Sequence, residues 1–208
     1  MKSIAALGIG AIVAVSAVVF AGKGPAPVVV IGKTAPAFTL TDTNGKARNL
    51  SDFSGKYVVL EWTNHQCPFV VKHYSSGNMQ KTQKWAKDKG VVWLSIVSSA
   101  EGKQGYLTPD EANKLMKEKG FNSAAMLMDS DGKVGKLYGA RTTPHMYVID
   151  PKGTLIYMGG IDDKATPNVA DLKEAKNYVI QALEESMAGK DVSVPTSRPY
   201  GCSVKYAD

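Results

Sequence analysis

The sequence predicts an α/β protein with a central mixed β-sheet flanked by helices, an N-terminal β-hairpin and an extended C-terminal tail. Residues 56–63 and 91–97 are rich in β-branched and aromatic residues and apolar at nearly every position, as strands covered on both faces are. Residues 68–88 and 172–187 have apolar positions at helical spacing. Strands that alternate with helices in this way are typical of an α/β sheet.

Length and composition fit one globular domain. The chain has 208 residues, of which 44% are hydrophobic and 21% charged. Lys and Arg number 25 against 19 Asp and Glu, a net charge of +6, and the basic residues are interleaved with acids. No basic stripe for nucleic acid is therefore expected. Two cysteines, Cys67 and Cys202, exclude a disulfide-dense scaffold and a four-cysteine zinc site.

The N-terminus is typical of a bacterial export signal. Met1-Lys2 precedes an apolar run from residue 4 to 21 without charge, and small or apolar residues stand before Gly22. We expect residues 1–21 to be a signal peptide; a membrane anchor and a buried core helix are the alternatives. The first two interpretations place the protein outside the cytoplasm, periplasmic or secreted, where a disulfide can persist.

The remaining elements follow in order. Residues 22–33, with glycines and two prolines, read as a linker into a domain over residues 34–187. Residues 188–208 have no clear period and read as a tail, laid on the domain or free. Within the domain we expect a hairpin (37–40 and 47–50, around a turn at 43–46), a helix (110–119) and three further strands (125–128, 145–149 and 154–158).

Cys67 is the candidate reactive residue. It stands between the strand at 56–63 and the helix at 68–88, whose first turn suits Pro68. Free backbone N–H groups and the helix dipole stabilise a thiolate at such a position and lower its pKa. The alternative is a small buried hydrophobic side chain.

Several motifs resemble the thioredoxin superfamily. They are Trp62, Cys67-Pro68-Phe69-Val70 at the start of a helix, and Thr143-Pro144 before a later strand. The segment Thr34-Ala35-Pro36-Ala37-Phe38 with its hairpin is similar to the entry of the redoxin and peroxiredoxin (AhpC-TSA) branch. The resemblance covers about residues 33–187 and implies a thioredoxin-like fold. It is greatest to exported peroxiredoxin-like redoxins that keep only the first motif cysteine.

The resemblance also implies roles for residues. Cys67 matches the attacking cysteine of the thioredoxin Cys-x-x-Cys motif, and Val70 stands where the second cysteine would be. Leu60 and Asn64 stand where a peroxidase carries proline and threonine or serine before its reactive cysteine, so the peroxidase signature is absent.

The substrate site follows from the same resemblance. Thr143 and Pro144 match the residues at the family's cis-proline, which faces the active cysteine and offers backbone groups to a substrate chain. With Pro68 and Phe69 they are the expected substrate-binding residues. Glu61, in an apolar strand, resembles the family's buried acid and is the candidate proton relay; a solvent-facing side chain is the alternative.

Cys202 determines which thiol chemistry is available. It lies in Tyr200-Gly201-Cys202-Ser203, in a tail long enough to fold back over the domain. It can resolve an intermediate on Cys67, form a permanent structural bridge with Cys67, or never meet it.

The sequence therefore predicts an exported thiol-disulfide oxidoreductase or antioxidant protein. Its expected partner is a protein thiol or disulfide, or a small oxidant, with no nucleic acid and with a membrane tether only through the N-terminus. The alternatives are a non-catalytic binding module with a structural Cys67–Cys202 bridge, and a metal or haem protein. His65, His73 and His145 are the candidate ligands for the last, but surface or partly buried roles are commoner, and we expect no metal and no cofactor.

Overall fold

The computed structural model of the protein describes residues 29–207. The expected export signal at residues 1–21 lies outside the described residues. None of the helices within 29–207 has the length and apolar character needed to span a bilayer. The last residues of the expected linker lie against the domain, where the Gly32 N–H donates to the carbonyl of Leu155 at 2.8 Å.

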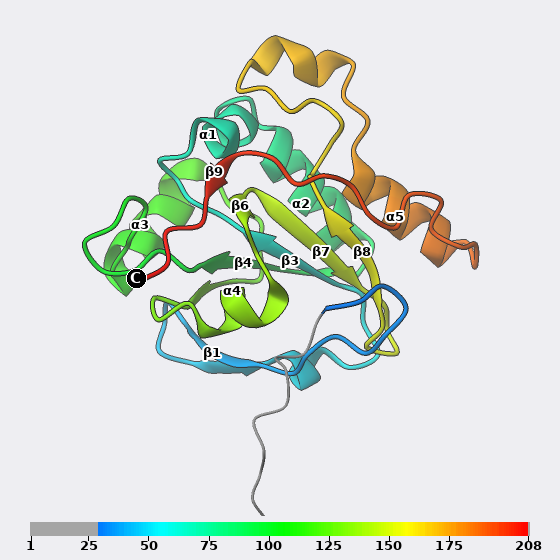
Figure 1. The fold of residues 1–208 in the computed structure, drawn as a ribbon, viewed down its shortest axis with the longest axis horizontal. Coiled ribbons are helices and arrows are strands. Elements are labelled where there is room, and N and C mark those ends of the chain that lie inside the picture. Colours follow the sequence, from blue (N-terminus) through cyan, green and yellow to red (C-terminus); the bar gives the residue numbers. More distant parts are fainter. Residues whose placement is uncertain (1–28, 208) are drawn as a thin grey trace, which may run out of the picture.

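A seven-stranded sheet forms the centre of the fold, in the order β2-β1-β5-β4-β3-β7-β8 (Figure 1). The strands are β1 (Thr39–Asp42), β2 (Ala47–Asn49), β3 (Val58–Trp62), β4 (Val92–Val97), β5 (Ala125–Met128), β7 (His145–Ile149) and β8 (Leu155–Gly159). β3, β4 and β5 run parallel, and the other neighbouring pairs are antiparallel. The predicted mixed α/β sheet is confirmed. β6 (Thr142–Thr143) and β9 (Cys202–Ser203) form a separate two-stranded ladder.

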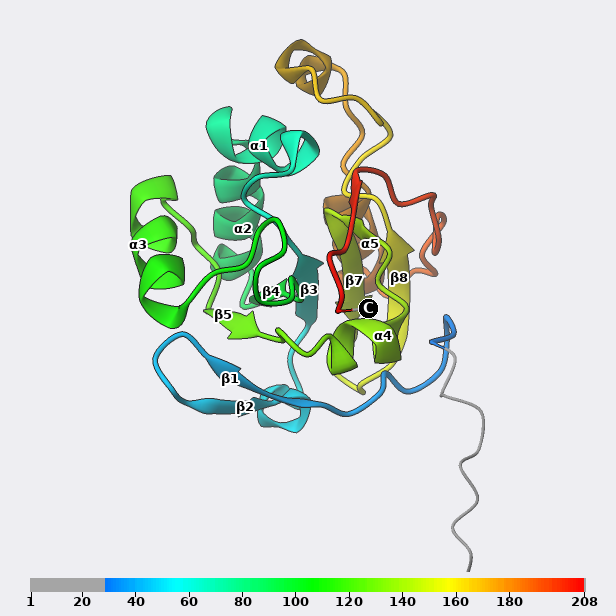
Figure 2. The same cartoon turned by 60° about the vertical axis from the view of Figure 1, so that its left-hand side comes forward.

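Helices cover both faces of the sheet. They are α1 (Pro68–Ser75), α2 (Asn78–Asp88), α3 (Pro109–Lys119), α4 (Lys133–Tyr138) and α5 (Tyr178–Met187), with 3₁₀ turns η1 (Leu50–Phe53) and η2 (Val169–Lys173). α1, α2 and α5 bury apolar residues against Val59 and Trp93, whereas α4 and the entry segment pack on the opposite face against Leu60 and Trp62. Figure 2 shows α1, α2 and α3 grouped together, with α4 apart from them.

The helix boundaries differ from the sequence prediction in three places. The helix expected over 68–88 is two helices, because the Ser76 hydroxyl donates to the Lys72 carbonyl and Gly77 takes a left-handed conformation with φ 73°. The helix expected over 172–187 begins only at Tyr178, where the side chain of Asn177 caps it. α4 is absent from the sequence prediction.

The hairpin is present with a shifted first strand. β1 begins at Thr39 rather than at residue 37, and Thr39 pairs with Asn49. The Asp42 carboxylate shapes the turn by accepting from the Asn44 and Lys46 N–H groups at 2.9 and 3.0 Å. An aspartate at this place satisfies the turn's free donors, and β1 continues to residue 42, which pairs with Leu127 of β5.

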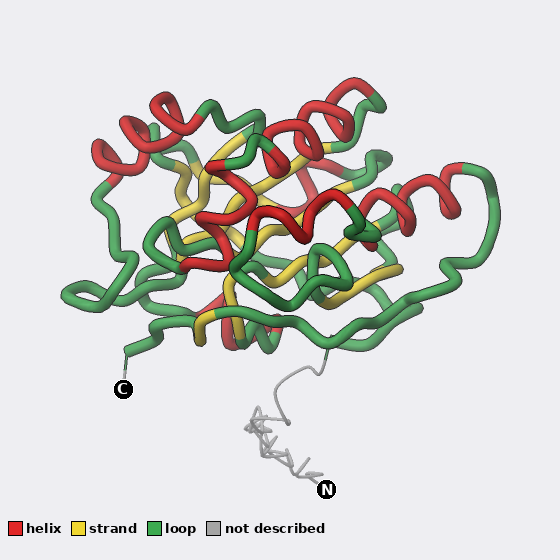
Figure 3. The backbone as a smooth tube through the Cα atoms, turned by 90° about the horizontal axis from the view of Figure 1, so that it is seen from above, coloured by secondary structure: helices red, strands yellow, loops and turns green. Residues whose placement is uncertain are grey.

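The C-terminal segment after α5 returns across the domain. Figures 1 and 3 show it running from the end of α5 over the region of β6 to the other side of the molecule. The Met158 N–H donates to the Pro195 carbonyl, and β9 then pairs with β6. The tail therefore lies on the domain, and it brings Cys202 back to the loop before β7.

Candidate active site

Cys67 lies at the junction of β3 and α1. It is the N-cap of α1, and Pro68 occupies the first turn. The Cys67 N–H donates to the Asn64 carbonyl at 3.0 Å, while the Cys67 carbonyl accepts from the N–H groups of Val70 and Val71 at 2.9 and 2.8 Å. This turn holds the Cys67 side chain at the N-terminal end of the helix, where donor groups concentrate.

The Cys67 sulfur is enclosed by the cis-proline loop and the C-terminal tail. The side chain is 0% exposed. Its thiol donates to the Thr143 carbonyl at 3.1 Å, and the backbone N–H of Cys202 donates to the sulfur at 3.4 Å. The sequence prediction therefore named two cysteines, 135 residues apart, that the fold brings into contact.

The two thiols differ in pKa because their environments differ. Burial alone raises the pKa of Cys67, but hydrogen bonds from the side chain and backbone of Cys202 and from the Val70 N–H outweigh it, so the pKa lies below its ordinary value. Burial and the neighbouring Cys67 sulfur raise the pKa of Cys202 to about 11. Cys67 is thus the group that ionises first, as an attacking thiol must.

The expected substrate-binding residues surround this pair. The Thr143–Pro144 peptide is cis, as the resemblance implies. Thr143 pairs with Cys202 in the β6–β9 ladder, and its hydroxyl contacts the Cys202 carbonyl at 3.5 Å. Pro68 is exposed and Phe69 half-buried on the first turn of α1. The structure therefore places Cys67, Cys202, Thr143 and the first turn of α1 around one point.

Glu61 is buried, as one of the two interpretations expected, but it lies in a separate network. Its carboxylate accepts hydrogen bonds from Tyr74, Gln83, Trp93 and Ser95, the shortest from the Trp93 indole at 2.7 Å. Burial raises the pKa of Glu61 despite these donors. None of these donors is a partner of the Cys67 sulfur, and the carboxylate ties α1 and α2 to the sheet.

The three histidines lie in different environments. His145 is buried beside Tyr147, whose hydroxyl lies 3.3 Å from its Nδ1, and burial lowers the pKa of His145 to about 4. His73 is buried within a polar cluster on α1, and His65 is half-buried. The part of the chain that the structure describes contains no group of three or more His, Cys, Asp or Glu side chains arranged to hold a metal ion.

Sequence reasoning missed the residues that hold the tail in place. Tyr200 and Tyr206 flank Cys202 and contact the domain through their hydroxyls. Gly201 has φ 122°, and a side chain there would collide with the Thr143 carbonyl oxygen. The sequence signal is the glycine directly before Cys202, because a glycine permits such a close backbone approach.

Comparison with known proteins agrees with this geometry. Residues 31–158 match the model of the AhpC/TSA family. Over 138 residues the chain is 33% identical to the thiol-disulfide oxidoreductase ResA of Bacillus subtilis (strain 168), a match that covers 66% of this chain and 70% of the relative.

Solved structures support the thioredoxin-like fold. An uncharacterized conserved protein from Geobacillus kaustophilus has a TM-score of 0.74 at 26% identity, over 86% of this chain and 94% of that one. The thioredoxin domain of a thiol-disulfide oxidoreductase from Bacteroides vulgatus has a TM-score of 0.50 at 24% identity, over 70% of this chain and 96% of that one. The predicted thioredoxin-like fold is confirmed.

Proposed function

Because the chain belongs to the AhpC/TSA family of the thioredoxin superfamily, we propose that it is a thiol-disulfide oxidoreductase in which Cys67 attacks and Cys202 resolves. The observation that carries this assignment is the contact of the two cysteines, with the Cys202 N–H 3.4 Å from the Cys67 sulfur. The similarity to the thiol-disulfide oxidoreductase ResA supports the activity. Val70, in place of the second motif cysteine, leaves Cys202 as the second thiol at this site.

The reaction takes two exchange steps. The Cys67 thiolate attacks one sulfur of a partner disulfide, the partner's S–S bond breaks, and its other sulfur leaves as a thiolate that takes up a proton. Cys202 then loses its proton and attacks the Cys67 sulfur, which releases the partner's second thiol and forms the Cys67–Cys202 disulfide. The partner gains two electrons and the two cysteines lose them; the reverse sequence oxidises a partner dithiol.

Surrounding groups favour this order. The Cys202 N–H and the Val70 N–H stabilise negative charge on Cys67, whereas Cys202 holds its proton more tightly. The exposed Pro68 and half-buried Phe69 offer apolar surface beside the sulfur, and Thr143 and Pro144 complete the partner site. Glu61 has no part in these proton transfers, because its hydrogen bonds go to Tyr74, Gln83, Trp93 and Ser95. Proton exchange at the half-buried Cys202 needs only water.

Export and an antioxidant role are further parts of the proposal. The charge-free run at residues 4–21 supports export. A hydroperoxide would oxidise Cys67 to a sulfenic acid with release of an alcohol, and Cys202 would condense with it, releasing water and forming the same disulfide. The pair of sulfurs in contact supports this reaction, although the peroxidase signature is absent.

Thiol trapping of the purified protein tests the assignment. Reduced wild type, Cys67→Ser and Cys202→Ser are treated with oxidised glutathione, quenched with an alkylating reagent and mapped by peptide mass spectrometry. Wild type should form the Cys67–Cys202 disulfide, Cys202→Ser should accumulate glutathione on Cys67, and Cys67→Ser should react far more slowly. The wild-type disulfide should titrate above about −300 mV, the range of catalytic pairs.

Two results would contradict the proposal. If no disulfide joins the two cysteines, Cys202 is not the resolving thiol. If the disulfide forms but resists strong dithiol until the domain unfolds, the bridge is structural and the protein is a binding module.

A further inference from the structure

We propose that Tyr200 and Tyr206 are positioning residues that pin the C-terminal arm (residues 199–206) at both ends and hold Cys202 over Cys67. This inference rests on the proposed function. The two tyrosines, with the polar side chains around the Tyr200 hydroxyl, determine how fast Cys202 resolves an intermediate and how completely the arm buries Cys67.

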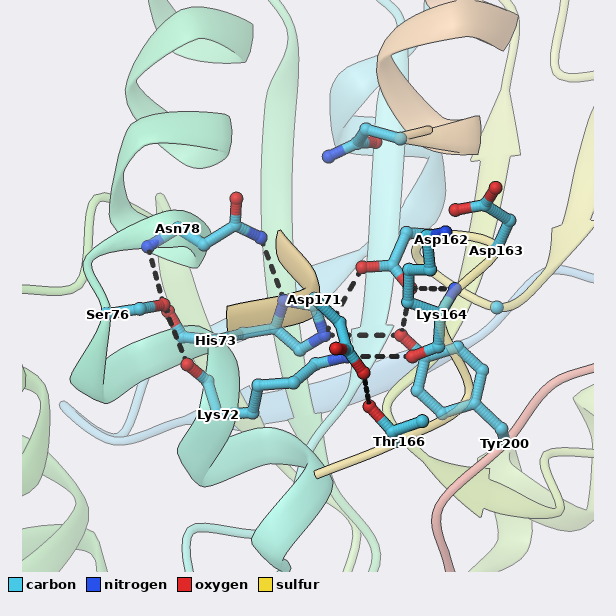
Figure 4. A network of polar contacts seen from close by, with 12 residues as sticks. Lys72, His73, Ser76, Asn78, Asp162, Asp163, Lys164, Thr166, Asp171 and Tyr200 are labelled. Carbon is cyan, nitrogen blue, oxygen red and sulfur yellow. Dashed lines mark hydrogen bonds and ion pairs between the residues drawn. The ribbon is translucent and has the colours of Figure 1, made fainter. Parts of the chain in front are cut away.

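Tyr200 is the first anchor. Its side chain is buried, and its hydroxyl donates to the Asp162 carboxylate at 2.5 Å (Figure 4). The Tyr200 ring lies 5.9 Å from the ring of Phe69, on the first turn of α1. The Lys72 ammonium lies 5.3 Å from the Tyr200 ring centroid. A buried tyrosine with a satisfied hydroxyl and an overlying cation is held in one orientation.

The anchor reaches the helix that carries Cys67. The Asn78 amide donates to Nδ1 of His73 at 2.8 Å, which leaves the proton on Nε2. Nε2 then lies 3.3 Å from the Tyr200 hydroxyl oxygen, which in turn donates to Asp162. Figure 4 shows this line of side chains running from α2 through His73 on α1 to the arm. The same helix, α1, therefore positions both Cys67 and the arm.

The cluster has its own charge arrangement. Burial lowers the pKa of His73 to about 3, so the ring is neutral, and burial raises the pKa of Asp162. The Lys72 ammonium faces the cluster and donates to the Lys164 carbonyl at 2.8 Å. Removing the Tyr200 hydroxyl takes from the buried Asp162 carboxylate its shortest hydrogen bond. The carboxylate then keeps the Lys164 N–H as a donor at 2.9 Å, and the loss of one of two donors to a buried acceptor is costly.

Tyr206 is the second anchor. Its hydroxyl donates to the Ala140 carbonyl at 2.8 Å. The ring lies over Gly132 and Gly135 at the start of α4, where a Cβ at Gly132 would come within 2.5 Å of it. The Lys136 ammonium lies 5.5 Å from the ring centroid, and the Ala100 N–H donates to the Lys205 carbonyl at 2.8 Å.

Between the anchors the arm is held mainly by backbone. Thr142 pairs with Ser203 and Thr143 with Cys202, and the Val204 N–H donates to the Arg141 carbonyl at 3.0 Å. Thr143 and Cys202 of this short ladder contact the fully buried Cys67 sulfur, while Cys202 itself is half-buried. A partner can therefore meet Cys67 only when residues 201–203 lift, and the two tyrosines return Cys202 to the sulfur afterwards.

The test compares Tyr200→Phe and Tyr206→Phe with Tyr57→Phe as the matched control. The Tyr57 hydroxyl contacts Ser186 at 3.0 Å, near the end of α5, and takes no part in the arm's contacts. Each reduced protein is mixed with an aromatic disulfide that releases a coloured thiolate at each step. The first release reports attack by Cys67, and the second reports resolution by Cys202.

We expect both arm variants to slow the second release at least tenfold and the control to leave it within twofold of wild type. The reduction potential of the Cys67–Cys202 pair supplies a second readout, which a general loss of stability would not move. A tenfold loss in the effective concentration of Cys202 shifts this two-electron potential by about 30 mV toward a stronger oxidant.

The outcomes separate the two proposals. If wild type shows no second release, the proposed function fails. If wild type shows it but both arm variants resolve at the wild-type rate, or if Tyr57→Phe slows resolution as much as they do, the tyrosines are not positioning residues.

Discussion

Replacing Gly201 with alanine should uncover Cys67. The residue has φ 122°, a conformation that costs a side chain about 1–3 kcal/mol, and the new Cβ would collide with the Thr143 carbonyl oxygen. Because that oxygen belongs to backbone, the arm must move instead. Opening breaks the β6–β9 ladder in wild type and variant alike, so the strain added to the closed arm, about 2 kcal/mol at the middle of that range, sets the difference between them. At about 1.4 kcal/mol per tenfold, about 2 kcal/mol corresponds to roughly 30-fold more of the open form.

Alkylation of Cys67 measures this opening. In a Cys202→Ser background Cys67 is the single thiol, and its reaction with iodoacetamide is followed by mass spectrometry across a pH series, so that the limiting rate separates exposure from ionisation. Gly201→Ala should raise that limiting rate about 30-fold. Gly189→Ala is the control: Gly189 also has a positive φ, 69°, but no atom lies within 4 Å of an added Cβ. An unchanged rate in Gly201→Ala, or an equal rise in Gly189→Ala, would refute the reasoning.

Three other changes have defined outcomes. His145→Asn should weaken the dependence of the unfolding free energy on acid pH. Burial lowers the pKa of His145 from 6.5 to about 4, so the unfolded chain binds a proton at a higher pH than the folded protein does. In wild type up to about 3 kcal/mol of the unfolding free energy is therefore lost as the pH falls from 6.5 to about 4. Urea titrations at several pH values check this. Val70→Cys in a Cys202→Ser background should restore an intramolecular disulfide to Cys67, since residue 70 lies one turn away; peptide mapping shows whether it does. Glu61→Gln should remove a pH dependence of the unfolding free energy that has the opposite sign. Burial raises the Glu61 pKa, so the contribution of Glu61 to stability is greatest below pH 4.5 and declines as the pH rises through the pKa of the folded state. Urea titrations at several pH values check this as well.

Much of the fold was readable because its strands are so apolar. β3 and β4 are buried at nearly every position, and both were predicted within two residues of their ends. The errors fall where single side chains override periodicity. Ser76 and Gly77 split one predicted helix in two, and Asn177 delays the start of α5. Such capping depends on which local hydrogen bond forms, and apolar spacing carries no information about it.

The sequence predicts those parts of the site that lie within a recognisable motif. Cys67 follows a buried strand and precedes a helix, which is visible in sequence, and Thr143-Pro144 carries its own signature. Whether Cys202 meets Cys67 at all stayed open in the sequence, because the path of a tail without periodicity depends on long-range contacts. Those contacts are made by Tyr200 through Asp162, a pair 38 residues apart.

The position of the second thiol changes what the site can do. A cysteine at residue 70 would sit on the same helical turn as Cys67 and would resolve an intermediate without any movement of the chain. Here the segment that carries Cys202 also buries Cys67. Resolution by Cys202 and burial of Cys67 therefore depend on the same movement of the arm. A partner must lift the arm to form the mixed disulfide, and the arm's return both releases the partner and closes the site. The rate of resolution is then set by the contacts that anchor the arm, and variants at Tyr200 should change that rate although they alter neither cysteine.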